Sequence, residues 1–192
     1  RLIQMQTSLL VLTRRLDTAN RELQRLSSTD GLTGIANRRF FDESLQREWR
    51  RARRNSGSVA LLICDVDHFK AYNDQYGHVA GDDCLRRIAV LIQKQMDRAS
   101  DLAARYGGEE FAVILPETTI SGAVLVAERI RHAVDEQLIP HPGSSHGRVT
   151  LSIGIAAAVP GLDNPPDDLV IDADRALYQA KSGGRDAVCR AD

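Results

Sequence analysis

The clearest structural signal in this chain is the segment LAARYGGEEFAVIL at residues 102–115. Leu102–Tyr106 and Phe111–Leu115 have the length and composition of short strands, and Gly107-Gly108 lies between them. A Gly-Gly pair favours a tight turn, because both positions can take a positive φ without a Cβ clash. The segment therefore predicts a β-hairpin.

Apolar runs on either side of this hairpin alternate between strand and helix length. The expected strands are Val59–Cys64, Val149–Ala158 and a short one near Ala187–Cys189. The expected helices are one capped by Asn37, which buries Phe41, Leu45, Trp49 and Ala52, followed by Val79–Met96, Ile120–Leu138 and Asp168–Lys181, the last closed by Gly183-Gly184. Alternating elements that include one hairpin predict an α+β fold, with a mixed sheet flanked by helices.

Residues 1–26 carry a heptad repeat. Its two apolar series are Leu2, Leu9, Leu16 and Leu23, and Met5, Leu12, Ala19 and Leu26. This pattern predicts a coiled coil, and the alternative is an amphipathic helix packed on its own domain. Ile3, Leu10 and Val11 fall off the seam, so a larger bundle is also open. We divide the chain into a coiled-coil signalling and dimerisation helix, 1–28, and a globular domain, 29–192.

Composition excludes several classes of protein. The 192 residues are 43% hydrophobic and 27% charged with a net charge of -1, which gives no general attraction for nucleic acid or anionic membrane. The locally basic Arg47–Arg54 is expected to be a solvated helix face rather than an anion-binding patch. Cys64, Cys84 and Cys189 are scattered, which argues against a disulfide framework or zinc site and fits a reducing cytosol. We expect a cytoplasmic fragment of a longer protein, whose upstream part could anchor it in a membrane; no membrane segment occurs within the fragment.

Carboxylates adjoin the hairpin turn. Glu109-Glu110 follows Gly107-Gly108, and two adjacent carboxylates contribute nothing to a hairpin. Bare backbone beside paired carboxylates suits a polyphosphate with a divalent metal. Asp65 ends the Val59–Cys64 strand, at the kind of sheet end where α/β proteins bind ligands. Asp65 and Glu109 thus predict a Mg²⁺ site, although Asp65 also suits a simple turn cap.

Together these segments resemble the GGDEF domains of bacterial diguanylate cyclases, in the Gly-Gly-Glu-Glu-Phe variant. The motifs that carry the resemblance are RYGGEEF at 105–111, DGLTG at 30–34 with Asn37-Arg38-Arg39, DVDHFK at 65–70, NDQYGH at 73–78, SIG at 152–154, Ala173-Asp174, and YQAK at 178–181 before Gly184-Arg185. They cover Asp30 to Val188 in order, and they look most similar to response-regulator cyclases with a coiled helix before this domain. The resemblance implies a nucleotide-cyclase, palm-like fold with a largely antiparallel sheet.

The family resemblance also implies a reaction, the condensation of two GTP into cyclic di-GMP and two pyrophosphates. It implies that Asp65, the Val66 carbonyl and Glu109 hold Mg²⁺, with Mn²⁺ as a possible substitute. Glu110 becomes a candidate for orienting or deprotonating the attacking hydroxyl. Asn73 and Asp82 are implied to read the guanine edge, which an amide and a carboxylate suit chemically.

Further substrate contacts follow from the same resemblance. The implied residues are Phe69, Lys70, His78, Gly107, Gly108, Lys181 and Arg185. For Lys181 and Arg185 the alternative is a favourable interaction with a helix C-terminus.

A second constellation is Arg98 with Asp101, which resembles the family's RxxD inhibitory motif. Asp101 lies six residues before Gly107, and ~3.3 Å per extended residue puts it roughly 20 Å from the turn. Arg129 resembles the arginine that completes this product-binding site, since arginine suits guanine and phosphate. The alternative for Arg98 and Asp101 is a weak helix-surface ion pair.

The implied partners are GTP as substrate, cyclic di-GMP as product and inhibitor, and a second copy of the chain, as a homodimer or higher homo-oligomer through residues 1–26. The chief rival is a silent GGDEF domain that acts as a cyclic di-GMP receptor. A non-catalytic coiled-coil module is another. Because both the catalytic and the RxxD residues are present, we favour the enzyme.

Two features depart from the family pattern, and one loop carries none of its motifs. His68 occupies a position that is often Phe in the family, and one residue is added between Asp82 and Arg98 relative to some members. His141 and His146 lie in a Pro/Gly/Ser loop, so both are expected to be solvated.

Overall fold

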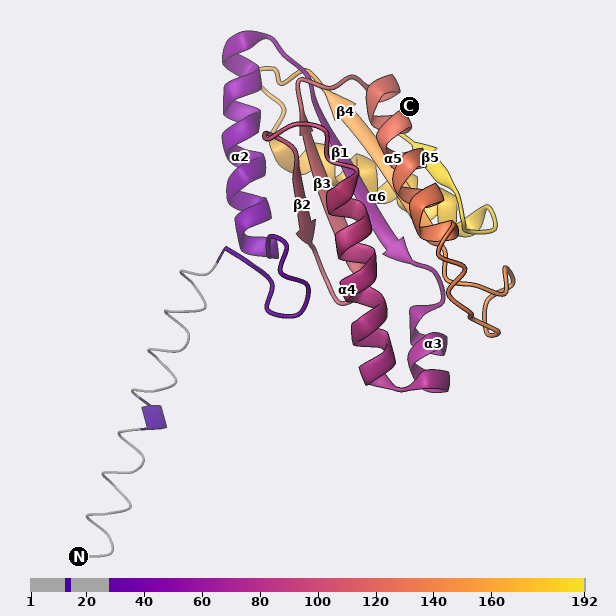
Figure 1. The fold of residues 1–192 in the computed structure, drawn as a ribbon. Helices are drawn as coiled ribbons and strands as arrows, with labels where there is room; N and C mark the ends of the chain where they lie inside the picture. The colour runs from indigo at the N-terminus through magenta and orange to yellow at the C-terminus, as the bar shows by residue number, and fades with distance from the viewer. Residues whose placement is uncertain (1–12, 15–27, 192) are drawn as a thin grey trace, which may run out of the picture.

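A mixed β-sheet organises the part of the chain that the computed structural model describes, residues 13–14 and 28–191 (Figure 1). Its five strands follow the order β2-β3-β1-β4-β5, and all neighbours are antiparallel except β4 and β5. The strands are β1 (Val59–Val66), β2 (Leu102–Arg105), β3 (Glu110–Pro116), β4 (Leu151–Ala158) and β5 (Val188–Arg190). The α+β architecture predicted from the sequence is confirmed. The predicted coiled coil lies outside the described residues except for 13 and 14, which are helical.

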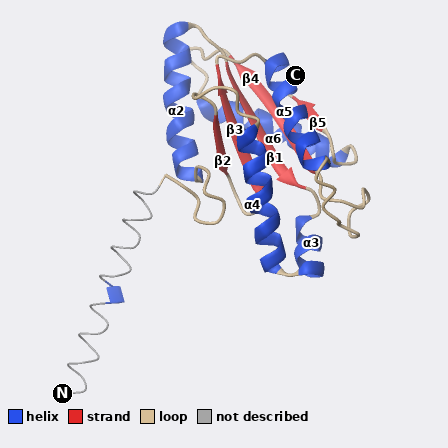
Figure 2. Ribbon diagram, in the orientation of Figure 1, coloured by secondary structure: helices blue, strands red, loops and turns tan. Residues whose placement is uncertain are grey.

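Helices cover both faces of this sheet (Figure 2). The helices are α2 (Arg38–Asn55), α3 (Phe69–Tyr76), α4 (His78–Lys94), α5 (Ile120–Asp135) and α6 (Pro166–Ser182). One face packs on α2 and α6, and the other packs on α4 and α5. Within the described residues no helix is both long and apolar enough to span a membrane.

The central strand β1 is buried on both faces. All eight residues of Val59–Val66 are buried, with Leu61 and Ile63 in one core and Leu62 and Cys64 in the other. A strand covered on both sides needs an unbroken apolar run rather than an alternating one, which explains the sequence signal. Asp65 therefore lies at the end of a strand with little water around it.

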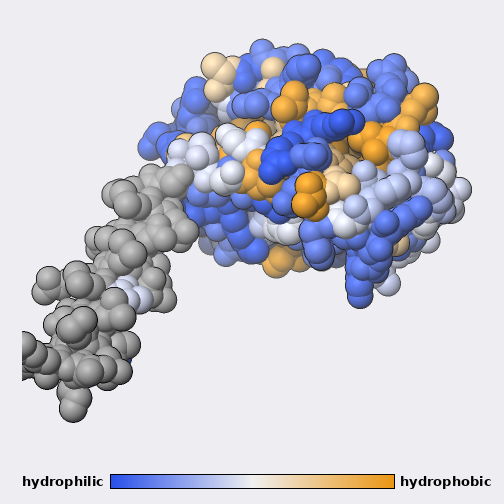
Figure 3. All heavy atoms as spheres, turned by 60° about the horizontal axis from the view of Figure 1, so that its bottom comes forward, coloured by the Kyte–Doolittle hydropathy of each residue, from blue (hydrophilic) through white to orange (hydrophobic). Residues whose placement is uncertain are grey.

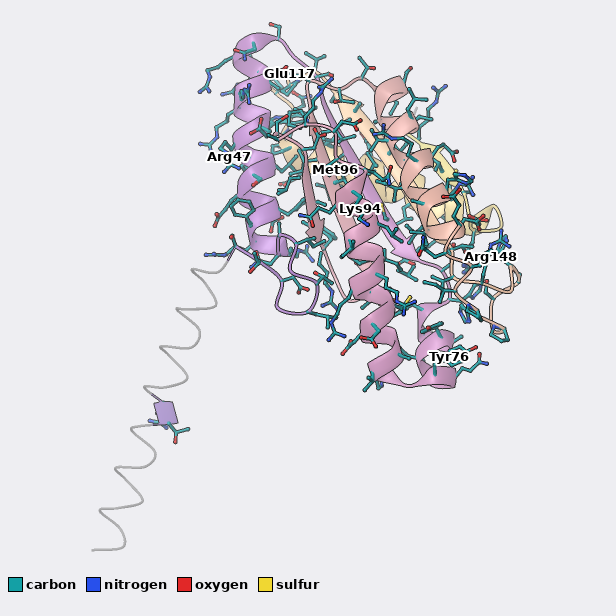
Figure 4. All side chains as sticks on the ribbon, viewed as in Figure 1. Arg47, Tyr76, Lys94, Met96, Glu117 and Arg148 are labelled. Atoms are coloured by element: carbon teal, nitrogen blue, oxygen red, sulfur yellow. The ribbon has the colours of Figure 1, made fainter. Side chains whose placement is uncertain are left out.

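Helix α2 forms as expected. The Asn37 side chain accepts a hydrogen bond from the Phe40 backbone at 2.9 Å, which satisfies one free amide of the first turn. The predicted apolar stripe is buried, with Phe41 fully inaccessible. The arginines of segment 47–54 are exposed, so the expectation of a solvated helix face is confirmed; Arg47 points away from the domain in Figure 4.

Two local predictions are corrected by the structure. Helix α3 was not predicted, because it is short and ends at Gly77, whose φ of +84° separates it from α4. The hairpin turn is also wider than a two-residue turn, because Tyr106–Glu109 connects the strands. Neither Gly107 nor Gly108 has a left-handed φ; a Cβ on Gly107 would instead lie 2.6 Å from a carboxylate oxygen of Glu110.

The prediction that His141 is solvated is wrong. Its ring is fully buried and lies edge-on to Tyr72, with centroids 5.3 Å apart. Its Nε2 lies 3.1 Å from the His68 carbonyl oxygen. The loop composition indicated exposure, but the loop folds back onto α3. His146 is partly buried.

Candidate active site

Three carboxylates gather where β1 ends and β3 begins. Asp65 and Glu110 are direct cross-strand partners. The Val66 amide donates to the Glu109 carbonyl at 3.3 Å, so the two chain segments run side by side through this end. The pairing of distant strands therefore brings Asp65, Glu109 and Glu110 together, as the sequence motifs implied.

The surroundings of Asp65 disfavour the ionised form of its carboxylate. The residue is only 9% exposed, and burial raises its pKa from 3.8 to about 6. The Lys181 ammonium, 2.9 Å from Oδ2, opposes this shift, whereas the charges of Glu109 and Glu110 reinforce it. A divalent cation would relieve this excess of negative charge, and oxygen donors suit Mg²⁺ or Mn²⁺.

The donor set that the resemblance implied fits such an ion. It consists of two carboxylates and the carbonyl of Val66 at the strand end. No cluster of three or more His, Cys, Asp or Glu side chains suited to a metal occurs in the described part of the chain, and the implied set needs only two. The remaining ligands would come from substrate and water, as is usual for Mg²⁺.

Two cations approach the same end from α6. Lys181 lies in the last turn of α6, which ends at Gly183. Three residues after Gly183 have positive φ: Gly184 at +119°, Arg185 at +66° and Asp186 at +44°. This turn reverses the chain into β5 and places Arg185 beside His68, whose pKa it helps to lower together with the larger effect of burial.

Asp67 is a buried carboxylate that the sequence reasoning did not single out. Its oxygens accept hydrogen bonds from the hydroxyls of Thr150 at 2.8 Å and Ser152 at 2.6 Å, and from the Asp186 amide at 3.1 Å. The side chain thus joins the end of β1 to β4 and to the turn that carries Arg185. The second acidic residue in Asp-Val-Asp at the end of a buried strand was the available signal.

The proposed base-reading residues lie on the paired helices α3 and α4. Asn73 and Asp82 are both partly buried. The Asn73 side-chain oxygen is buried without a hydrogen-bond partner among the described residues, which is unusual for a buried polar atom. The helices approach closely there, because a methyl group on Gly81 would overlap the Asn73 amide.

The other implied substrate residues surround this region. Phe69 is buried and stacks on Tyr72 with centroids 6.1 Å apart. Lys70 and His78 are exposed. Figure 3 brings this end of the domain forward and shows a largely hydrophilic surface with smaller apolar areas.

The signature turn is anchored by Arg105 and Asp30, a link that sequence reasoning missed. The Arg105 guanidinium donates to the Gly108 carbonyl at 2.8 Å and lies 3.2 Å from the Asp30 carboxylate. Burial alone would raise the pKa of Asp30, but hydrogen bonds from Thr33 and the charge of Arg105 lower it overall. The turn is thereby tied to the chain segment that enters the domain.

Arg98 and Asp101 lie at the opposite end of the sheet. They precede β2, whose first residue, Leu102, pairs with Ile114 near the end of β3. Figure 4 shows Glu117, which follows β3, at the far end of the domain from Tyr76. The expected separation of the RxxD motif from the carboxylates is confirmed.

The RxxD residues make local contacts. Asp101 accepts a hydrogen bond from the Arg98 backbone at 3.0 Å, and so acts as a turn cap rather than as an ion-pair partner. The Arg98 guanidinium lies 3.4 Å from the Pro116 carbonyl. Arg129, on α5, reaches Asp97 at 2.6 Å, which places it next to the same turn.

The fold and the site together match those of GGDEF domains. They share a mixed sheet with helices on both faces, a Gly-Gly-Glu-Glu turn beside the central strand, and nearby cations. The chain matches the family described as "Diguanylate cyclase, GGDEF domain" over residues 27–187. It therefore belongs to the GGDEF family.

This chain is similar to proteins of several bacteria. Response regulator PleD of Caulobacter vibrioides is 42% identical over 164 residues, which cover 85% of this chain and 36% of PleD. Diguanylate cyclase DgcP of Pseudomonas aeruginosa is 41% identical over 159 residues, covering 82% of this chain and 23% of that protein. The chain thus spans about a third or less of the length of these two relatives.

Solved structures agree with the fold. The GGDEF domain of DgcB from Caulobacter crescentus, in complex with c-di-GMP, has a TM-score of 0.78 at 37% identity, over 85% of this chain and 95% of that one. A DgcB structure that includes its coiled coil has a TM-score of 0.79 at 34% identity and covers 99% of both chains.

Proposed function

We propose that this domain is a diguanylate cyclase that condenses two GTP into cyclic di-GMP and two pyrophosphates. The observation that carries the proposal is the buried Asp65 carboxylate, next to Glu109 and Glu110 and in contact with Lys181. This cluster of three carboxylates with a lysine suits a metal-bound polyphosphate. The adjacent carboxylates Glu109 and Glu110 contribute nothing to the stability of the hairpin. Family membership and relatives named diguanylate cyclases support the same activity.

Asp65, the Val66 carbonyl and Glu109 would hold Mg²⁺ or Mn²⁺, which supplies charge neutralisation at the reacting phosphate. In each of two steps, the 3′-hydroxyl oxygen of one GTP forms a bond to the α-phosphorus of the other. The bond from that phosphorus to the pyrophosphate oxygen breaks. Glu110 orients the hydroxyl or accepts its proton.

The nucleotide would lie with its base between α3 and α4 and its phosphates at the end of β1. Asn73 and Asp82, both partly buried, take the guanine edge, because an amide and a carboxylate can pair with its acceptors and donors. The phosphates meet cations and backbone amides, because a polyphosphate needs both charge and close approach. The residues in this second group are Phe69, Lys70, His78, Gly107, Gly108, Lys181 and Arg185.

Each domain holds one GTP, so two domains must meet face to face. We propose that the helix of residues 1–28 dimerises the chain and raises the effective concentration of one domain near the other. The globular domain of residues 29–192 then acts as a homodimer or larger homo-oligomer in the cytoplasm.

Arg98, Asp101 and Arg129 form a proposed binding site for the product. Both guanidinium groups lie at one turn, where their present contacts are mainly to backbone carbonyls and to Asp97. Arginine pairs well with guanine and with phosphate oxygens. Arg98→Ala should leave initial turnover unchanged and shift the cyclic di-GMP inhibition curve to higher concentration. An unchanged curve would count against this site.

The deciding experiment is incubation of the chain with GTP and Mg²⁺, followed by chromatography for cyclic di-GMP and pyrophosphate. Glu109→Ala should abolish product formation, whereas Glu43→Ala, at an exposed position of α2, should not. Retained activity in Glu109→Ala would overturn the proposed metal set. Absence of turnover in the unmodified chain, with tight binding of cyclic di-GMP, would instead favour a receptor.

A further inference from the structure

A loop between α5 and β4 reaches both backbone segments that surround the proposed phosphate site. We name residues 140–148 the histidine loop. Its two ends pair as an isolated bridge between Pro140 and Arg148, and the His141 amide donates to the Gly147 carbonyl at 3.0 Å. Arg148, labelled in Figure 4, is tied back to α5 through Asp135. The loop is therefore a folded unit rather than a loose connection.

The first segment that it contacts is the turn from β1 into α3. His68 has a φ of +55°, a left-handed conformation that is unfavourable for a residue with a Cβ. Among the described residues no side chain caps α3, so the first backbone amides of that helix have no such cap in competition with a ligand. Their direction depends on how firmly the His68 backbone is held.

His141 supplies that restraint. Its Nε2 lies 3.1 Å from the His68 carbonyl, and because a carbonyl only accepts, the proton must be on Nε2. The ring is fully buried against Tyr72, and its Nδ1 has no hydrogen-bond partner among the described residues. Burial removes the hydration of both ring nitrogens, and only the hydrogen bond of Nε2 compensates for this loss. A buried histidine with this cost is consistent with a positioning role.

The second segment is the turn between α6 and β5, with its three successive positive φ values. His146 Nε2 lies 3.3 Å from the Gly184 carbonyl, one residue before Arg185. Asp186 is held at the same time by Asp67 through its amide and by Arg131 at 2.9 Å. The turn that carries Arg185 is thus fixed from three sides, and the histidine loop is one of them.

We propose that the histidine loop positions the two phosphate-binding segments, with His141 acting on the turn at His68 and His146 on the turn at Gly184. This inference rests on the proposed function, because it assigns the loop to the triphosphate of GTP. Neither histidine touches substrate in this arrangement; each acts through backbone that does. The loop sets the affinity for the β- and γ-phosphates and leaves the guanine contacts of α3 and α4 alone.

Binding without turnover tests the proposal. The full chain is titrated calorimetrically, in the presence of Mg²⁺, with 3′-deoxy-GTP, which lacks the attacking hydroxyl, and with GMP, which lacks the outer phosphates. His141→Leu should weaken 3′-deoxy-GTP binding about tenfold and change GMP binding less than about twofold. His141→Gln should restore affinity, because the Gln amide can donate from nearly the position of Nε2.

His132→Leu is the matched control, because His132 is an exposed histidine of α5 whose recorded partner is Glu136. It should bind both ligands as the unmodified chain does. If His141→Leu does not fold, as judged by circular dichroism, His146→Leu carries the same test, since its side chain is 30% exposed and contributes less packing than the buried His141.

Two results would overturn the role of the loop: equal weakening of both ligands, or unchanged 3′-deoxy-GTP binding in the leucine variants. Failure of the proposed function looks different, because the unmodified chain would then bind neither ligand. Selective loss of triphosphate affinity with rescue by glutamine would establish the role.

Discussion

Replacing Asp65 by asparagine should stabilise the fold while it destroys the proposed metal site. Burial holds the pKa of Asp65 at about 6, above its ordinary 3.8, so the folded state disfavours the ionised carboxylate. At 1.36 kcal/mol for each pH unit, this difference corresponds to about 3 kcal/mol. Asparagine resembles the neutral acid in shape and carries no such penalty.

The sign of the pH dependence follows from proton linkage. Because the folded pKa is the higher one, the folded state binds more protons at Asp65 between pH 3.8 and about 6, and the contribution of Asp65 to stability falls as pH rises through that window. The penalty is complete above pH 6 and absent below 3.8. Asp65→Asn should therefore gain about 1–3 kcal/mol at pH 8 and nothing near pH 3.5.

Urea denaturation in EDTA measures this gain, with Asp163→Asn, at an exposed loop position, as a control that should change nothing. Adding Mg²⁺ should then stabilise only the chain that keeps Asp65, by about 2.7 kcal/mol at a hundredfold excess over Kd. The difference in the free energy of unfolding between the two chains should therefore disappear. A variant that is equally or less stable at pH 8 without metal would refute the electrostatic reasoning. Equal stabilisation of both chains by Mg²⁺ would refute the metal assignment.

Three further substitutions test the packing that holds the site. Gly154→Ala should cost about 3 kcal/mol in urea denaturation, because a methyl group there would overlap the Ala173 carbonyl of α6; no loss would contradict the close approach of α6 to β4. Phe41→Ala should cost about 3–5 kcal/mol by the same assay, since its ring is fully buried, and a change under 1 kcal/mol, roughly a surface effect, would argue against the α2 interface. Asp67→Ala should lower the free energy of unfolding by about 3 kcal/mol, because it leaves buried donors such as the Ser152 hydroxyl unpaired; near-native stability would show that water replaces the carboxylate.

Local chemistry explains why much of the domain could be anticipated from sequence. The cap at Asn37, the buried run of β1 and the apolar stripe of α2 each depend on neighbouring residues, and all three form as expected. The motif residues also supplied the approximate positions of Asp65 and Glu109. Short elements were harder, because α3 has too few residues for a clear helical period.

Several decisive features of the site depend on residues that are distant in the sequence. Asp67 acquires Thr150 and Asp186 as partners only because β1 pairs with β4 and the α6–β5 turn folds over both. His141 resembles a solvated loop residue until the loop packs on Tyr72.

The sequence by itself determined the order of the elements other than α3, the family and the identity of the charged groups, because these follow from periodicity and motif. Tertiary structure alone decided how strongly those groups interact. The pKa of Asp65 depends on its burial and on Lys181, which lies more than a hundred residues away. Burial and long-range charge are properties of the assembled sheet and helices, so they cannot be predicted from a local sequence pattern.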